Sequence, residues 1–187
     1  DEPCVSAPEG QFPWTEGLDA RFREKWGYDL MEHLPALFAE SDAGEETRRV
    51  LGDYHDLVGE LFAERYFLRL RDWCRAHGML ATGHVNGDHV AIGNAVYGYH
   101  HILRCLRAMD IPGVDVIWRQ LFCAPPDGAL EQYAPLCAND FFPRYASSAA
   151  HQTGARLSMT ESYAIFGDGV TYDHMRWLGS FQAVRGL

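Results

Sequence analysis

The residues of this chain that could do chemistry are carboxylates and a histidine associated with short apolar runs. His84 and Glu161 each end such a run, and Asp115 lies within a third. In parallel α/β folds functional side chains gather where strands end, so these three residues are expected to share a site. A carboxylate placed there can be desolvated and raised in pKa, as a general acid requires. Glu161 is therefore a candidate acid, and a structural glutamate paired with an arginine is the alternative.

The chain begins with Asp1-Glu2-Pro3, which offers two more carboxylates. The strand-end rule would also select Asp1 and Glu2 if the chain began at the end of a strand. On the residues alone, a terminal Asp-Glu-Pro is more typical of a solvated end. The chain has no starting Met and no basic segment followed by an apolar one, so we expect a processed product or a fragment.

His84 also opens a stretch with Asn86, Asp88 and His89 that resembles a metal-binding loop at first sight. No recognised ligand spacing supports that interpretation. An imidazole that orients a substrate hydroxyl is the better functional hypothesis, and a hydrogen-bonded core histidine is the structural alternative. A metal-dependent hydrolase using His84, Asp88 and His89 stays open as a further alternative.

Three other patterns do not favour catalysis. His100-His101 is predicted within a helix, where adjacent side chains diverge and chelate poorly. Ser147-Ser148 lacks the GxSxG pattern of a nucleophile elbow. Glu60 and Glu64 have no ExxH partner, which favours a solvated helix face over a di-iron site.

The elements that would position the candidates are short apolar strands alternating with helices. The three runs begin at Met79, Val114 and Arg156, which are 35 and 42 residues apart. A βα unit needs about 30 residues or more, so an α/β fold with parallel strands is predicted. No dinucleotide or P-loop fingerprint supports a doubly wound sheet. A complete barrel needs about 250 residues, so a partial TIM-type barrel of about strands 4–8 is expected.

Helical periodicity and end signals mark the remaining elements. The strongest helix is predicted over 52–77, with Gly78 after its last turn. Thr15 and Thr171 are predicted helix caps, Pro35 is expected to split a helix, and Pro112-Gly113 is predicted as a turn. The other predicted elements are helices from 15 to Gly27 and over 29–39, 93–109, 140–153 and 171–180, exposed or loop segments over 1–15, 40–48 and 123–138, and a final strand at 181–187.

Composition places the chain among single-domain globular proteins. It has 187 residues, of which 47% are hydrophobic and 22% charged. The net charge of −10 disfavours nucleic-acid binding, and no apolar run is long enough for a membrane span. Five cysteines at irregular spacing, without CxxC, predict buried free thiols rather than a zinc or disulfide framework. These features leave the cellular location open.

An ordered series of motifs resembles the catalytic (β/α) barrel of bacterial glycoside hydrolases of the α-L-rhamnosidase type and their relatives. The series spans nearly the whole chain, and its order and spacing are more specific than any one motif. It comprises Asp1-Glu2-Pro3, Gly27–Leu30, Leu34–Phe38, Glu60–Phe62, Trp73–Gly78, Thr82-Gly83-His84, Met109–Asp115, Ser147–Gln152 and Thr160-Glu161.

The resemblance implies that two glutamates act as acid and as base or nucleophile in hydrolysis of a rhamnoside or similar glycan. It places Glu2 at the end of the fourth strand and Glu161 at the end of the seventh, with residues 1–187 as the C-terminal half of the barrel. The contacts to sugar are then expected from His84, Asp115, Trp118, His151 and Tyr163.

The resemblance also bears on ligands and partners. Some of these enzymes bind calcium near the site, but no calcium loop is evident here, so no cofactor is expected. A carbohydrate substrate is expected, and neither nucleic acid nor a membrane. An open half barrel would expose strand edges, so it should pair with the other half or with a second copy.

Two matters stay open at this point. The chain could be an inactive or incomplete barrel that binds carbohydrate or a partner chain without catalysis. The sugar, the linkage and the choice between retention and inversion are undetermined. A separation of about 5–10 Å between the Glu2 and Glu161 carboxyl groups would support the glycosidase hypothesis.

Overall fold

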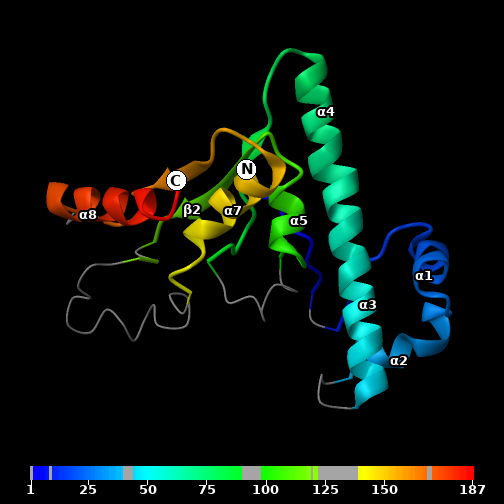
Figure 1. Cartoon of the computed structure of the whole chain (residues 1–187). Helices are drawn as coiled ribbons and strands as arrows, with labels where there is room; N and C mark the ends of the chain where they lie inside the picture. The colour runs from blue at the N-terminus through cyan, green and yellow to red at the C-terminus, as the bar shows by residue number, and fades with distance from the viewer. Residues whose placement is uncertain are drawn as a thin grey trace.

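The architecture is a mixed α/β fold around a parallel three-stranded sheet, as the alternation of runs and helices predicts (Figure 1). The computed structural model describes residues 2–8, 10–39, 44–89, 98–118, 120–121, 139–167 and 170–187. Within them the strands are β1 (Thr82–Gly83), β2 (Ile111–Val116) and β3 (Met159–Ser162), in the order β1-β2-β3. Helix α5 (Ile102–Leu106) precedes β2 and helix α7 (Pro143–Thr153) precedes β3.

The central strand β2 begins earlier than predicted, because Pro112 and Gly113 belong to it and form no turn. Pro112 is paired in register with Gly83, and Gly113 with Met159. A Cβ on Gly113 would lie 2.5 Å from the Gly83 carbonyl oxygen, so the neighbouring strand needs a glycine here. The Pro-Gly pair therefore marks a close approach of two strands rather than a reversal of the chain.

One long helical rod runs along the molecule and consists of α3 (Glu45–Phe62), the π-helical segment η2 (Ala63–Leu68) and α4 (Arg69–Ala76) (Figure 1). It starts before the predicted residue 52, since Glu45 and Glu46 occupy its first turn, where acidic side chains favour the helix dipole. Gly78 follows its last turn with φ +72°, as predicted.

The N-terminal helices α1 (Leu18–Trp26), η1 (Leu30–His33) and α2 (Leu34–Leu37) pack against α3. The first helix is not capped by Thr15. It begins after Gly17, whose φ of +77° is left-handed, and it ends at Gly27 as expected. The predicted 29–39 helix is split, with Pro35 in the first turn of α2. The shared core includes Phe22, Leu30, Leu37, Tyr54 and Leu57.

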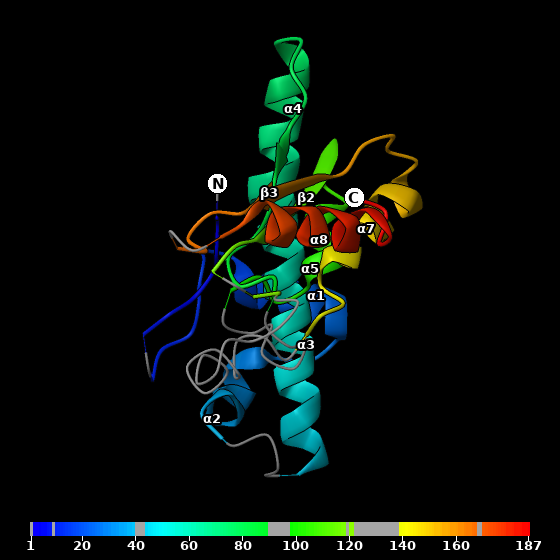
Figure 2. The same cartoon turned by 90° about the vertical axis from the view of Figure 1, so that its left-hand side faces the viewer.

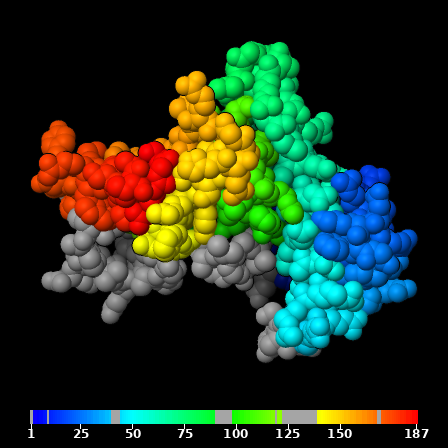
Figure 3. All heavy atoms as spheres, in the orientation of Figure 1, coloured from blue at the N-terminus to red at the C-terminus, as the bar shows by residue number. Residues whose placement is uncertain are grey.

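The C-terminal helix α8 (Tyr172–Ala183) replaces the predicted last strand. Thr171 caps it as expected, in a capping box with His174. Phe181 stacks on Trp177 with ring centroids 5.0 Å apart, a contact that helical i, i+4 spacing provides. In the turned view α8 lies in front of the long helical rod (Figure 2), and the space-filling view shows α7 between α8 and that rod (Figure 3).

The predicted helix over 93–109 is shorter in the part of the chain that the structure describes, where it covers only Ile102–Leu106. His100 has a left-handed φ of +56° and His101 caps α5, so the histidine pair does not lie inside a helix. Residues 93–97, the predicted 123–138 loop, Asp1, Cys123 and Cys137 lie outside the described residues.

The remaining cysteines, Cys4, Cys74 and Cys105, are free thiols. Only Cys105 is fully buried, and burial raises the pKa of its thiol to about 12. The prediction of buried free thiols therefore holds for Cys105, whereas Cys4 is exposed. None of the described helices combines the length and apolarity needed to cross a membrane.

Candidate active site

Three of the predicted site residues meet where the parallel strands end. Asp115 of β2 and Glu161 of β3 are neighbours in register. His84 follows β1 directly, and its Nε2 lies 3.1 Å from Oε2 of Glu161. The imidazole is only 2% exposed, while the Glu161 side chain is 42% exposed. A buried histidine thus holds a carboxylate that remains accessible to a ligand.

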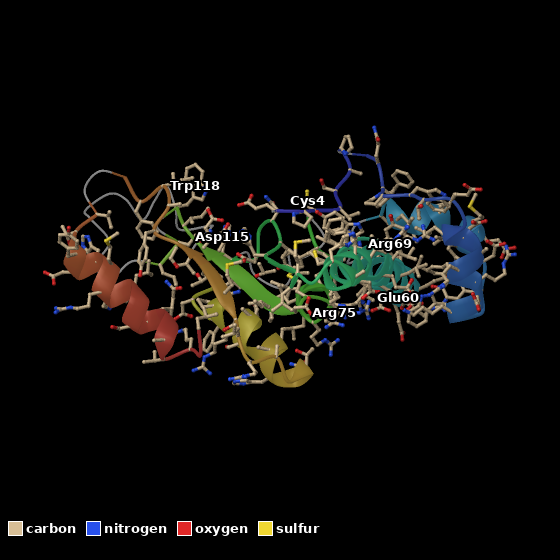
Figure 4. The ribbon with its side chains drawn as sticks, turned by 90° about the horizontal axis from the view of Figure 1, so that it is seen from above. Cys4, Glu60, Arg69, Arg75, Asp115 and Trp118 are labelled. Carbon is tan, nitrogen blue, oxygen red and sulfur yellow. The ribbon has the colours of Figure 1, made fainter. Side chains whose placement is uncertain are left out.

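Glu2 joins this group from the N-terminal segment. A carboxylate oxygen of Glu2, a ring nitrogen of His84 and a carboxylate oxygen of Asp115 lie within 4.8 Å of one another. The Asn86 amide donates a 3.2 Å hydrogen bond to Glu2 Oε2. Because both glutamates lie beside the His84 ring, their carboxyl groups are within about 10 Å of each other, compatible with glycosidase carboxylate pairs. Figure 4 labels Asp115 on β2 and Cys4 on this N-terminal segment.

Asp115 carries the clearest electrostatic perturbation among these residues. Burial raises its pKa to about 6; the Gln120 hydrogen bond and His84 lower it, and nearby Glu2 raises it. A carboxyl with this pKa exchanges its proton near neutral pH. It can therefore hold or release a proton beside Glu2.

Gln120 orients Asp115 and was not anticipated from the sequence. Its amide nitrogen donates to Asp115 Oδ1 at 3.2 Å and lies 2.9 Å from Nδ1 of His89. Its Oε1 accepts the Ile117 N–H at 2.9 Å. These contacts fix the amide orientation and leave His89 Nδ1 as an acceptor. A lone glutamine after an apolar run carries no sequence signal for this role.

Asp88 stabilises the backbone of β2 through a buried hydrogen bond. It is fully buried, and its Oδ2 accepts the backbone N–H of Asp115 at 2.8 Å. Burial and the nearby Asp115 carboxyl raise the pKa of Asp88 well above its usual value. Asp88 Oδ1 has no hydrogen-bond partner among the described residues. Asp88 and His89 thus support the site around Asp115 and do not join the Glu2–His84–Asp115 group.

The raised pKa of Asp88 leads to a prediction about stability. Its pKa is raised in the folded state, so the stability it contributes is present below about pH 4, the unfolded pKa, and declines as pH rises. Asp88→Asn cannot titrate. The free energy of unfolding should be measured in urea at pH 4.5 and 7.5 for both proteins. The value for Asp88→Asn minus the value for the parent protein should be larger at pH 7.5 than at pH 4.5.

Asp88→Ala provides the comparison, because it removes the acceptor of the Asp115 N–H and leaves that donor buried. Relative to Asp88→Asn, which does not titrate either, it should lose about 1–3 kcal/mol at both pH values. If the difference in unfolding free energy between Asp88→Asn and the parent protein is the same at both pH values, the raised pKa of Asp88 is contradicted.

Trp118 and Tyr163 adopt left-handed backbone conformations just beyond β2 and β3. Their φ angles are +55° and +73°, which is unusual for bulky residues. Two backbone hydrogen bonds join these segments. The Trp118 N–H donates to the Ala164 carbonyl at 3.2 Å, and the Tyr163 N–H donates to the Val116 carbonyl at 3.3 Å. Trp118 is 49% exposed. Strain of this kind clusters at ligand-binding sites.

The other predicted contacts are placed differently. The Tyr163 hydroxyl donates to the Met175 carbonyl of α8 at 3.4 Å, so it is engaged within the protein. His151 is exposed in the last turn of α7, at the helix end from which the chain enters β3. The structure therefore does not bring His151 to the group around His84.

A separate cavity of about 360 Å³ lies between the N-terminal segment and the long helix. Trp14 and Tyr66, both partly exposed aromatics, line it together with Leu61 and Phe62. Neither Glu2 nor any of the residues that meet around His84 lines this cavity.

Glu2, His84 and Asp115 form a group that could hold a metal ion. Calcium takes six to eight oxygen ligands. These three residues supply two carboxylates and one imidazole, and Nε2 of that imidazole is paired with a third carboxylate, that of Glu161. These described side chains alone supply fewer ligands than calcium takes.

A parallel sheet with carboxylates at its strand ends is typical of an α/β enzyme. The alpha-L-rhamnosidase family model matches residues 5–173, so the chain belongs to this family, glycoside hydrolase family 106. It is also similar to a Formosa agariphila protein named "Putative beta-glucuronidase", with 40% identity over 73 residues. That match covers 37% of this chain and 6% of the relative. No solved structure matches the chain.

Proposed function

We propose that this chain carries the acid–base centre of a glycosidase that cleaves a rhamnoside or a similar glycan. The observation that supports this most directly is the placement of Glu161 and Glu2 beside the buried His84 at the strand ends. Family membership supports the reaction class, hydrolysis of a glycosidic bond. The active unit needs a carbohydrate substrate and no cofactor.

In the proposed reaction, the bond between the anomeric carbon and the leaving oxygen breaks through an oxocarbenium-like transition state. Glu161 is exposed and held by the His84 Nε2–H rather than desolvated, so in place of the acid role it acts either as the base toward the water that bonds the anomeric carbon or as the nucleophile whose glycosyl ester water then hydrolyses. Glu2 donates the proton to the leaving oxygen, and Asp115 beside it can exchange a proton near neutral pH. His84, Asp115 and Trp118 contact the sugar, with Trp118 as an exposed stacking face.

The proposal extends to the fold, in which β1, β2 and β3 would be the fifth to seventh strands of a (β/α)8 barrel. One hydrogen bond supports the position of Glu2 at the end of the fourth strand. The Asn86 N–H donates to the Pro3 carbonyl at 3.4 Å, so the N-terminal segment runs beside the segment that follows β1. Residues 1–187 would form one domain that pairs with the other barrel half or with a second copy.

A substrate panel tests this function. Aryl α-L-rhamnoside, aryl β-glucuronide and aryl β-glucoside should be offered to the protein, with the anomer of the product followed by NMR. We expect turnover of the rhamnoside, and the first-formed anomer would distinguish inversion from retention. Turnover of the glucuronide alone would redirect the substrate assignment. No turnover of any glycoside would favour a binding role without catalysis, and activity lost with a chelator would favour a metal-dependent hydrolase.

A further inference from the structure

The N-terminal segment that carries Glu2 is fixed through the backbone of Val5. The Val5 N–H donates to the Gly98 carbonyl at 2.7 Å, and the Val5 carbonyl lies 3.2 Å from Nε2 of His100. Val5 is thus held on both of its backbone polar groups by the segment that precedes α5. Glu2 lies three residues before this anchor, about 10 Å along an extended chain.

His100 is in turn held by His55 on α3. The two Nδ1 atoms are 3.0 Å apart, and the rings are stacked with centroids 5.1 Å apart. Gly59 lies one turn beyond His55, and a Cβ there would come within 3.2 Å of the His100 Cβ. The absence of a side chain at Gly59 therefore lets the segment around His100 lie close against the long helix.

The hydrogen bonds assign a direction to this chain of contacts. The Val5 carbonyl can only accept, so His100 Nε2 must carry the proton. In a neutral imidazole Nδ1 of His100 is then an acceptor, and His55 Nδ1 must donate to it. Burial lowers the pKa of both histidines, which keeps them neutral near pH 7. The order is therefore His55 to His100 to the Val5 carbonyl.

We infer that His100, oriented by His55, is a positioning residue that holds Glu2 in place through the backbone of Val5. This inference rests on the proposed function of Glu2. Glu2 is itself exposed; its side chain accepts a hydrogen bond from Asn86, which is also exposed, and lies beside Asp115. An anchor three residues away, made by partly buried groups, adds a backbone constraint on where the carboxyl group lies. Misplacing a catalytic group by about 1 Å can cost about 100-fold in rate.

The test is His100→Ala, with two readouts. We expect kcat to fall about 10- to 100-fold with little change in KM. Independently of any substrate, hydrogen exchange should become faster in the peptide that contains the Val5 amide. His100→Gln keeps a side-chain N–H donor for the Val5 carbonyl. It should therefore restore much of kcat and much of the slow exchange of the Val5 amide. His55→Phe keeps a stacked ring but removes the Nδ1 donor. Its kcat and its Val5 exchange rate should therefore lie between those of His100→Ala and His100→Gln.

His101→Ala is the matched control at the adjacent position. His101 caps α5 by accepting the Arg104 N–H, so its loss should lower stability while leaving kcat and Val5 exchange unchanged. Unchanged exchange in His100→Ala would overturn the anchor. Faster exchange with unchanged kcat, or an equal loss of kcat in His101→Ala, would overturn the positioning role. A parent protein inactive on every glycoside would instead refute the proposed function, while the exchange result would still report the anchor.

Discussion

Glu161→Gln should lower kcat/KM for the aryl glycoside by about 1000-fold or more, while the free energy of unfolding changes little. The amide is nearly isosteric and can still accept from the His84 Nε2–H, so the imidazole keeps its partner. The amide cannot act as a base or a nucleophile, and the loss of that role lowers the reaction rate by about 100- to 10000-fold. Steady-state kinetics and urea unfolding on the same preparation measure the two quantities.

Glu64→Gln is the matched control for this change. Glu64 lies in η2 and pairs with Arg21 on α1 at 3.2 Å, among residues outside the site. Its replacement should leave kcat/KM within about twofold, since exposed ion pairs contribute little. Azide added to Glu161→Ala should recover part of the activity by supplying the missing anion. Full activity in Glu161→Gln would remove Glu161 from the mechanism and leave the family assignment intact.

Gly113→Ala should destabilise the fold by about 3 kcal/mol or more. The new Cβ would lie 2.5 Å from the Gly83 carbonyl oxygen and 2.7 Å from Met159 Cε. The methionine end can move, but the carbonyl belongs to the backbone of the neighbouring segment, so the strands must separate. Because β2 carries Asp115 between His84 and Glu161, activity should fall with stability.

Gly52→Ala provides the comparison within the same chain. Gly52 lies in the interior of α3, and no atom lies within 4 Å of the Cβ it lacks. Alanine there should stabilise the protein by about 0.5–1 kcal/mol, because glycine loses more backbone freedom in a helix. Urea unfolding of both variants tests the argument. A Gly113→Ala protein as stable as the parent would mean that the strand spacing can widen without cost.

Local signals predicted much of the secondary structure. Gly27, Gly78 and Gly154 end or follow helices with left-handed φ angles, and Thr171 caps α8, because these preferences depend only on the residue and its nearest neighbours. The three apolar runs predicted the parallel strands. Strand-end position alone selected His84, Asp115 and Glu161, since the carboxyl ends of parallel strands meet at one edge.

Local signals failed where a distant segment determined the backbone. Pro112-Gly113 has the composition of a turn, yet Gly83 and Met159 on either side make it part of a strand. Phe181 has the β propensity of a strand residue, yet it continues α8 by stacking on Trp177. In both cases packing against neighbours outweighed intrinsic propensity.

Sequence alone determined the class of the fold, the family and the strand-end carboxylates, because these depend on periodicity, motif order and local position. Only the tertiary structure revealed Gln120 against Asp115, Asp88 beneath it and the His55–His100 pair behind Val5. The histidines of that pair are 45 residues apart, and His100 is 95 residues from Val5. Hydrogen bonds between such distant residues leave no periodic trace in the chain, so they become visible only when folding has brought the groups together.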